Sequence, residues 1–247
     1  MQYTLKYICI NMPTFEAKMA PGYLLVVAGV KWVLWPKSHW NFRSKTNDCV
    51  PDYVSWHFPG YGNPWACAFV VQAANVREMI RELGLKVKGI QVNEYGFCDK
   101  ETTGDLLYSL CQIERAKLDF AIHSCWDDVC WSGRINGLLT RDQRPTGKWH
   151  VYERYARLAG SIVQTKPAGQ LELVASRDDR QVAVLFGSRE KLDTVDLRFT
   201  NLSRGPVAGG KVHVFAELIT ATGGTEPCPP NHIRTVLDQE VSVQGDR

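Results

Sequence analysis

Apolar residues recur with two different periods through the middle of the chain. Short apolar runs at 53–58, 89–94 and 118–123 are bounded by turn-forming residues, and they predict buried strands. Between the first two runs, residues 76–83 carry apolar side chains at positions i, i+3, i+4 and i+7. This spacing predicts a helix that ends at Gly84, because glycine readily adopts the left-handed conformation that follows a last helical turn.

Two further helical patterns cover 106–117 and 147–160. Together with the strands they give the order strand, helix, strand, helix, strand, helix, which is typical of parallel strands joined by crossover helices. The carboxyl ends of parallel strands meet at one edge of a sheet, and ligands bind at that edge in α/β proteins. The sequence therefore predicts a ligand site where these strands end.

The strand ends supply the candidate residues of that site, which are Trp56 and His57, then Asn93, Glu94 and Tyr95, then Cys125 and Trp126. Glu94 is the first candidate for chemistry, because α/β barrels carry catalytic carboxylates at the carboxyl ends of strands. A single glutamate in this position is more often an ordinary polar residue beside a loop. Its chemical role depends on what the rest of the chain places around it.

After Gly160 the apolar period changes from 3.6 to 2. Alternating segments at 171–175, 181–186, 194–199 and 211–215 are separated by turn residues and predict a small antiparallel β-sandwich. The tail after Gly223 contains three prolines and is expected to be a loop and a frayed end. We therefore expect two domains, over 1–160 and 161–247.

The first 47 residues carry no clear period, and their structure stays uncertain. A helix over 29–43 would contain Pro36, which breaks the hydrogen-bond ladder. No stretch is apolar enough to predict a transmembrane helix, and no segment reads as a convincing signal peptide.

Composition excludes several function classes. Of the 247 residues, 45% are hydrophobic and 22% are charged, as in soluble globular proteins. The net charge of +3 is small and the basic residues are scattered, so we expect no nucleic-acid partner. The eight cysteines are spread singly with no CxxC pair, so we expect no metal site. No organic cofactor is expected either.

Four strings resemble the second half of fungal glycoside hydrolases of the family 39 type: Val50 to His57, Gln91 to Gly96, Gly137 to Thr140, and Trp149 to Ala156. These enzymes belong to the large TIM-barrel clan of retaining glycosidases, and the resemblance covers roughly residues 48–220. It implies a partial (β/α)8 TIM barrel, with strands six to eight recognisable, followed by a C-terminal antiparallel β-sandwich. The partner implied is a carbohydrate, such as a glycoside or a fragment of a plant polysaccharide. Related enzymes are often secreted.

In that clan the nucleophile stands at the end of the seventh strand, which the resemblance places at Glu94. A retaining enzyme also needs a second carboxyl group about 5–5.5 Å away as its acid/base. That group would come from the fourth strand, which this sequence does not show. Asp127 and Asp128 are the nearest candidates for a substitute acid, but an exposed pair of loop residues is the more plausible interpretation of them. The resemblance thus implies retaining hydrolysis of O-glycosidic bonds, with a non-catalytic carbohydrate-binding remnant as the alternative. A purely structural protein is the third interpretation.

The resemblance also implies substrate contacts at the strand ends. Trp126 matches an aromatic residue that the clan often carries under the sugar at the end of the eighth strand. Core packing explains Trp126 and Trp56 as well as stacking on a sugar does. Tyr95 is a candidate for donating a hydrogen bond to the nucleophile carboxylate, and packing is the stronger interpretation for it. Asn93 is a candidate for binding a sugar hydroxyl or for capping a loop, and His57 for contacting substrate or for filling a strand end.

Overall fold

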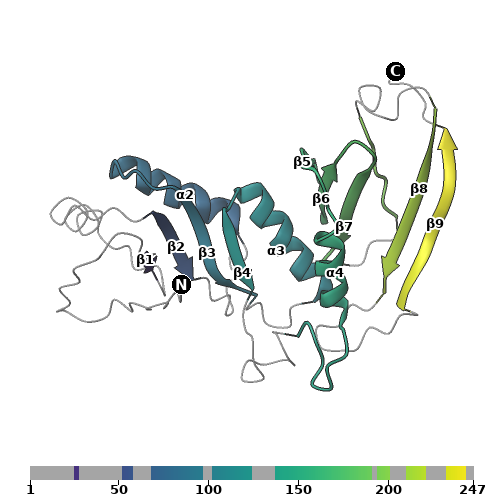
Figure 1. Ribbon diagram of the computed structural model, residues 1–247, viewed down its shortest axis with the longest axis horizontal. Coiled ribbons are helices and arrows are strands. Elements are labelled where there is room, and N and C mark those ends of the chain that lie inside the picture. Colours follow the sequence, from purple (N-terminus) through teal and green to yellow (C-terminus); the bar gives the residue numbers. More distant parts are fainter. Residues whose placement is uncertain are drawn as a thin grey trace. The chain divides into compact units, whose positions relative to one another are not determined.

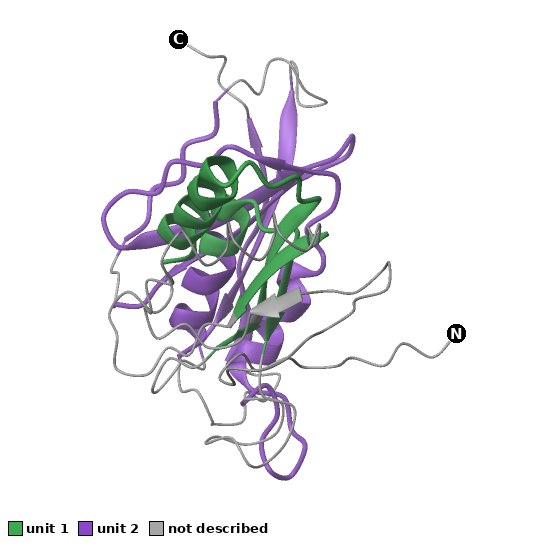
Figure 2. Ribbon diagram, turned by 90° about the vertical axis from the view of Figure 1, so that its left-hand side faces the viewer, with its two compact units in different colours: residues 1–99, 112–124 green, residues 100–111, 125–247 purple. Residues whose placement is uncertain are grey.

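The computed structural model describes residues 25–27, 52–57, 68–96, 102–123, 137–190, 194–200, 210–220 and 232–242. The chain divides into two compact units (Figure 2). The first unit contains residues 1–99 and 112–124, and the second contains residues 100–111 and 125–247. The expected domain boundary near residue 160 stays a prediction.

A four-stranded parallel sheet forms the centre of the first unit (Figure 1). Its strands pair in chain order and are β1 (Leu25–Val27), β2 (Tyr53–His57), β3 (Gly89–Tyr95) and β4 (Phe120–His123). The predicted parallel order of the last three strands is confirmed, and β1 adds a strand within the segment where the sequence carries no clear pattern. The protein is therefore a mixed α/β protein with a curled parallel sheet of the partial-barrel kind.

Three helices follow the predicted patterns and are α2 (Phe69–Glu82), α3 (Thr103–Ala116) and α4 (Gly147–Tyr155). The prediction that the last helix continues to Gly160 is wrong. Hydrogen bonds from Arg157 N to Arg154 O and from Leu158 N to Tyr155 O, both 3.1 Å, join residues three apart and tighten the final turn.

The first two helices end in the same backbone arrangement. The residue that reverses the chain is Gly84 after α2, with a φ of +64°, and Lys117 after α3, with a φ of +49°. In both cases the following amide donates to a carbonyl five residues earlier, as in a Schellman motif. Arg77 on α2 donates to the carbonyl oxygens of Ala116 (2.8 Å) and Lys117 (2.6 Å). This guanidinium satisfies carbonyls at the end of α3 and joins the two helices within the first unit.

Two antiparallel sheets lie in the second unit (Figure 1). One sheet contains β5 (Ser161–Val163), β6 (Leu171–Arg177) and β7 (Val182–Ser188), and the other pairs β8 (Lys211–Ile219) with β9 (Ile233–Ser242). The predicted strands at 171–175, 181–186 and 211–215 are confirmed and extended.

Two expectations for this region are wrong. Residues 194–199 form no strand, although burial still alternates there, with Val195 and Leu197 half-buried between exposed neighbours. An alternating pattern alone therefore does not make a strand. Within the described residues, no other strand pairs with this segment. The tail is not entirely frayed, because β9 pairs with β8 along nine register positions from Lys211 to Ile219.

Helix α4 is joined to β8 by an ion pair. Arg154 Nη2 lies 3.1 Å from Glu217 Oε2. Glu153 shares a hydrogen bond with His150 (Oε2 to Nδ1, 3.1 Å) and also pairs with Arg154 and Arg157. The hydrogen bond with His150, together with the positive charge of the two arginines, holds the pKa of Glu153 below its ordinary value.

Candidate active site

The carboxyl end of β3 contains one more residue than either of its neighbouring strands. Against β2, Trp56 pairs with Val92 and the next residue, His57, pairs with Glu94, so β3 takes two steps where β2 takes one. Against β4, the pairs Val92–Ala121 and Tyr95–His123 also leave one extra residue in β3. A bulge of this kind redirects the side chains that follow it, and bulges are common beside active sites.

The bulge changes which face of the sheet each residue of β3 occupies. Ile90 and Val92 share one face because strand residues alternate, and both are buried. Without the extra residue Glu94 would lie on that same face. Instead Tyr95 takes it, and its ring meets Phe69 of α2 edge-on at 6.0 Å between centroids. Glu94 consequently lies on the opposite face.

Trp56 and Tyr95 both occupy the face that packs on α2. Trp56 is 7% exposed, and its indole N–H donates to Oε1 of Gln72 on α2 over 3.0 Å. Tyr95 is 3% exposed and also meets His123 edge-on at 5.2 Å. These contacts give both aromatic residues a packing role. The sequence could not separate packing from sugar contact for Trp56 or from a hydrogen bond to the nucleophile for Tyr95, because the face of each residue depends on strand register.

Three polar or aromatic residues share the face on which Glu94 lies, and the backbone of His57 is paired beside it. Register places Ser55 opposite Gln91, Gln91 opposite Phe120, and His57 opposite Glu94. Ser55 is fully buried, Gln91 and Glu94 are half-buried, and Phe120 is 60% exposed. Sequence reasoning does not single out Ser55, Gln91 or Phe120; the signal for them is alternation along each strand, once the bulge is known.

The structure places the other predicted site residues only in part. The backbone of His57 lies in β2 beside Glu94, and that of Asn93 lies in the bulge, but both side chains fall outside the described residues. Trp126 lies wholly outside them. Among the predicted residues, the structure therefore brings together the backbones of His57, Asn93 and Glu94 and directs Trp56 and Tyr95 to the helix side.

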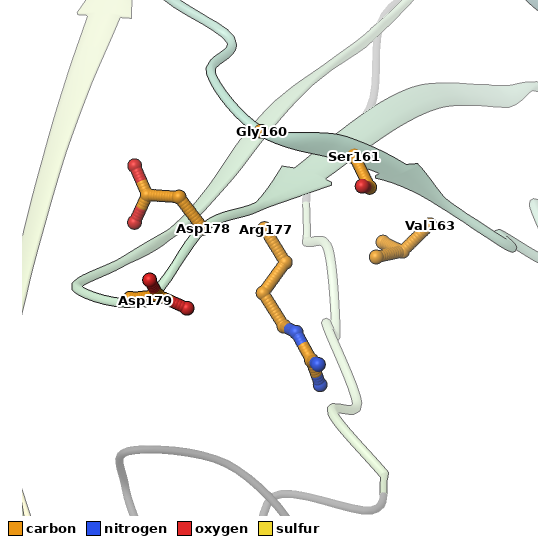
Figure 3. Close-up of a pocket in the computed structure, with 6 residues that line it drawn as sticks. All are labelled: Gly160, Ser161, Val163, Arg177, Asp178 and Asp179. Carbon is orange, nitrogen blue, oxygen red and sulfur yellow. The ribbon is translucent and has the colours of Figure 1, made fainter.

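The second unit contains a hollow of about 410 Å³, which is lined by Gly160, Ser161, Val163, Arg177, Asp178 and Asp179 (Figure 3). Figure 3 shows the Arg177 side chain extending away from both aspartates. The Asp178 carboxylate accepts hydrogen bonds from the backbone N–H groups of Arg180 (2.7 Å) and Gln181 (2.8 Å), which lower its pKa. Asp178 thus stabilises the β6–β7 turn, and the hollow shows no converging chemical groups.

Within the part of the chain that the structure describes, no three His, Cys, Asp or Glu side chains gather closely enough to hold a metal ion. In the same residues, no helix has the length and apolar character needed to span a membrane.

Comparison with solved structures shows the fold. A protein named N2152 from Neocallimastix frontalis is similar over 89% of this chain and 55% of its own, with a TM-score of 0.64 and 21% identity. A monomeric β-xylosidase from Caulobacter crescentus CB15 is similar over 90% of this chain and 58% of its own, with a TM-score of 0.55 and 14% identity. The chain thus spans just over half the length of these structures.

A third solved structure, a GH39 β-xylosidase from Caulobacter crescentus, is similar over 64% of this chain and 36% of its own chain, with a TM-score of 0.47 and 18% identity. No protein-family profile matches the chain. No curated protein matches it either.

Proposed function

We propose that this chain carries retaining glycoside hydrolase chemistry, with Glu94 as the nucleophile. The observation that carries the proposal is the bulge in β3, which directs Glu94 away from the packed helix side at the carboxyl end of a central parallel strand. The fold shared with a solved β-xylosidase supports a sugar as the substrate class. Within this proposal, β2, β3 and β4 act as barrel strands six to eight, and the two antiparallel sheets form the β-sandwich that follows them.

The proposed reaction proceeds in two displacements. In the first, a Glu94 carboxylate oxygen attacks the anomeric carbon, the glycosidic C–O bond breaks, and the leaving oxygen takes a proton from an acid. In the second, water attacks the same carbon and gives a proton to the group that acted as the acid, the bond to Glu94 breaks, and the configuration of the sugar is retained overall. Glu94 is half-buried, which leaves part of its carboxylate accessible for the attack.

The proton donor belongs to a second carboxyl group about 5–5.5 Å from the nucleophile. We expect this group from a segment outside the described residues or from a further part of the barrel. His57, whose backbone is paired with that of Glu94, is the nearest candidate for orienting the carboxylate or contacting the sugar. Asn93 and Trp126 complete the proposed sugar contacts.

A second candidate function is carbohydrate binding without turnover. Phe120 favours it, because an apolar ring that is 60% exposed lies on the same face of the sheet as Glu94. Sugars pack the apolar C–H side of their rings against aromatic faces, so such a side chain suits binding even where no acid is present.

Dinitrophenyl glycosides separate the two candidates, because their leaving group needs little protonation and a nucleophile can act alone. We expect the folded protein to release dinitrophenolate from one member of a panel of xyloside, arabinoside, galactoside and glucoside. Glu94→Gln should abolish this release, while Glu114→Gln, which changes a carboxylate on α3, should retain it. Sugar binding without release by the wild-type protein would support the binding remnant and contradict the enzyme.

A further inference from the structure

The Ser55 hydroxyl is the feature that the proposed chemistry leaves unexplained. Ser55 is 0% exposed, and its Oγ atom is buried without a hydrogen-bond partner. A buried hydroxyl without a partner is costly, and in native proteins such groups normally bind an ordered water when no protein group is available. Ser55 is therefore a candidate for binding a buried water molecule.

The neighbours of Ser55 indicate what that ligand contacts. Gln91 is directly opposite on β3 and on the same face, with an amide that can both donate and accept. Neighbouring strands are about 4.8 Å apart, so one small molecule can reach both side chains. Glu94 lies in the next row on this face, one pleat repeat or about 6.6 Å beyond Ser55. Two hydrogen bonds of about 2.8 Å through one water reach up to about 5.6 Å, and the Glu94 side chain is long enough to cover the remaining distance.

We propose that Ser55 and Gln91 bind a buried water molecule, and that this water donates a hydrogen bond to the Glu94 carboxylate from the amino-terminal side of its row. Ser55 then acts as a positioning residue, which holds the carboxylate through the water and does not touch the sugar. The catalytic consequence rests on the proposed function of Glu94. The water site itself depends only on the burial of Ser55 and on the strand register.

A high-resolution crystal structure tests the site directly. We expect an ordered water within 3.2 Å of Ser55 Oγ, of the Gln91 amide and of a Glu94 carboxylate oxygen, and we expect Ser55→Ala to lose it. The melting temperature of Ser55→Ala should fall, because the water loses a partner. An empty site, or a rise in the melting temperature of Ser55→Ala, would overturn the proposal. The matched control is Ser109→Ala, since Ser109 is equally buried and its hydroxyl donates to Asp105 O over 3.1 Å.

Kinetics separate positioning from a purely structural role. For the reactive dinitrophenyl glycoside, we expect Ser55→Ala and Gln91→Met to reduce kcat about tenfold with KM nearly unchanged, and Ser109→Ala to leave kcat within twofold of wild type. Gln91→Met keeps the side-chain volume and provides a second variant if Ser55→Ala fails to fold. Unchanged kcat in both site variants would overturn the positioning role. Absence of release by the wild-type protein would instead contradict the nucleophile, while the crystal structure would still decide the water site.

Discussion

Gly89 begins β3 at a position where an added Cβ atom would force neighbouring side chains to move. A Cβ atom added there would lie 2.3 Å from Oδ2 of Asp119 and 2.9 Å from Cε1 of Tyr53. The same Asp119 oxygen accepts a hydrogen bond from the Ile90 N–H over 2.8 Å. Gly89→Ala must therefore displace the carboxylate that joins the start of β3 to β4.

The expected cost follows from these contacts. Loss of a hydrogen bond to a charged group costs about 1.5–3 kcal/mol, and crowding a packed site adds about 1–3 kcal/mol. Replacing a strand glycine by alanine returns about 0.5–1 kcal/mol through the unfolded chain. We expect Gly89→Ala to reduce the free energy of unfolding by about 3 kcal/mol, which corresponds to a fall of about 6–12 °C in melting temperature at this chain length.

Thermal unfolding followed by circular dichroism measures this change. The control is Gly210→Ala, because a Cβ at Gly210 meets no atom within 4 Å, and it should change stability by less than about 0.5 kcal/mol. The double variant Gly89→Ala/Asp119→Ala should cost less than the sum of the two single variants, because the clash with the carboxylate is gone and only the contact with Tyr53 remains. Additive costs, or a Gly89→Ala protein as stable as wild type, would contradict the predicted clash with Asp119.

Four further variants test other parts of the structure. Lys117→Gly should raise the free energy of unfolding by about 0.5–1 kcal/mol, and Gly84→Ala should lower it by about 1 kcal/mol, because both residues have a positive φ at a helix end. Urea titration measures both changes, and changes of the same sign in the two variants would contradict the prediction. Trp56→Phe should cost about 1–3 kcal/mol by leaving the buried amide oxygen on α2 without its donor, and equal stability in urea would contradict the contact. Because the hydrogen bond with His150 and two arginines lower the pKa of Glu153 in the folded state, its stabilising effect is present above its unfolded pKa and is lost as pH falls through the folded pKa. The melting temperature of Glu153→Gln should therefore fall less than that of the wild type between pH 7 and pH 3. Parallel curves of melting temperature against pH would contradict this.

The sequence predicts those elements in which one period runs without interruption. The predicted helix over 76–83 coincides with the last part of α2 to within one residue, and the predicted strand over 53–58 matches β2 to within one residue. Both are predictable because their apolar residues keep a single spacing. The position of Glu94 at a strand end is also predictable, since it requires only the strand and its direction. Its face is not, because the bulge beside Asn93 shifts alternation by one residue.

A shift in register also makes β9 difficult to predict from the sequence. Register shifts between Ala216 and Glu217 of β8, whose partners in β9 are Leu237 and Thr235, so Val236 is the extra residue and is 52% exposed. Alternation read from Ile233 therefore fails halfway along the strand. Conversely, residues 194–199 alternate without being paired, because strand formation depends on a partner that the segment's own pattern does not specify.

The most direct test of the proposed function is to trap the sugar on the nucleophile. The folded protein would be incubated with dinitrophenyl 2-deoxy-2-fluoroglycosides of the same four sugars, and its intact mass and peptide masses would then be measured. We expect a mass increase of one fluorosugar, located on the peptide that contains Glu94 and absent from Glu94→Gln. A folded protein that gains no mass with any of the four sugars, or gains it on a different residue, would contradict Glu94 as the nucleophile.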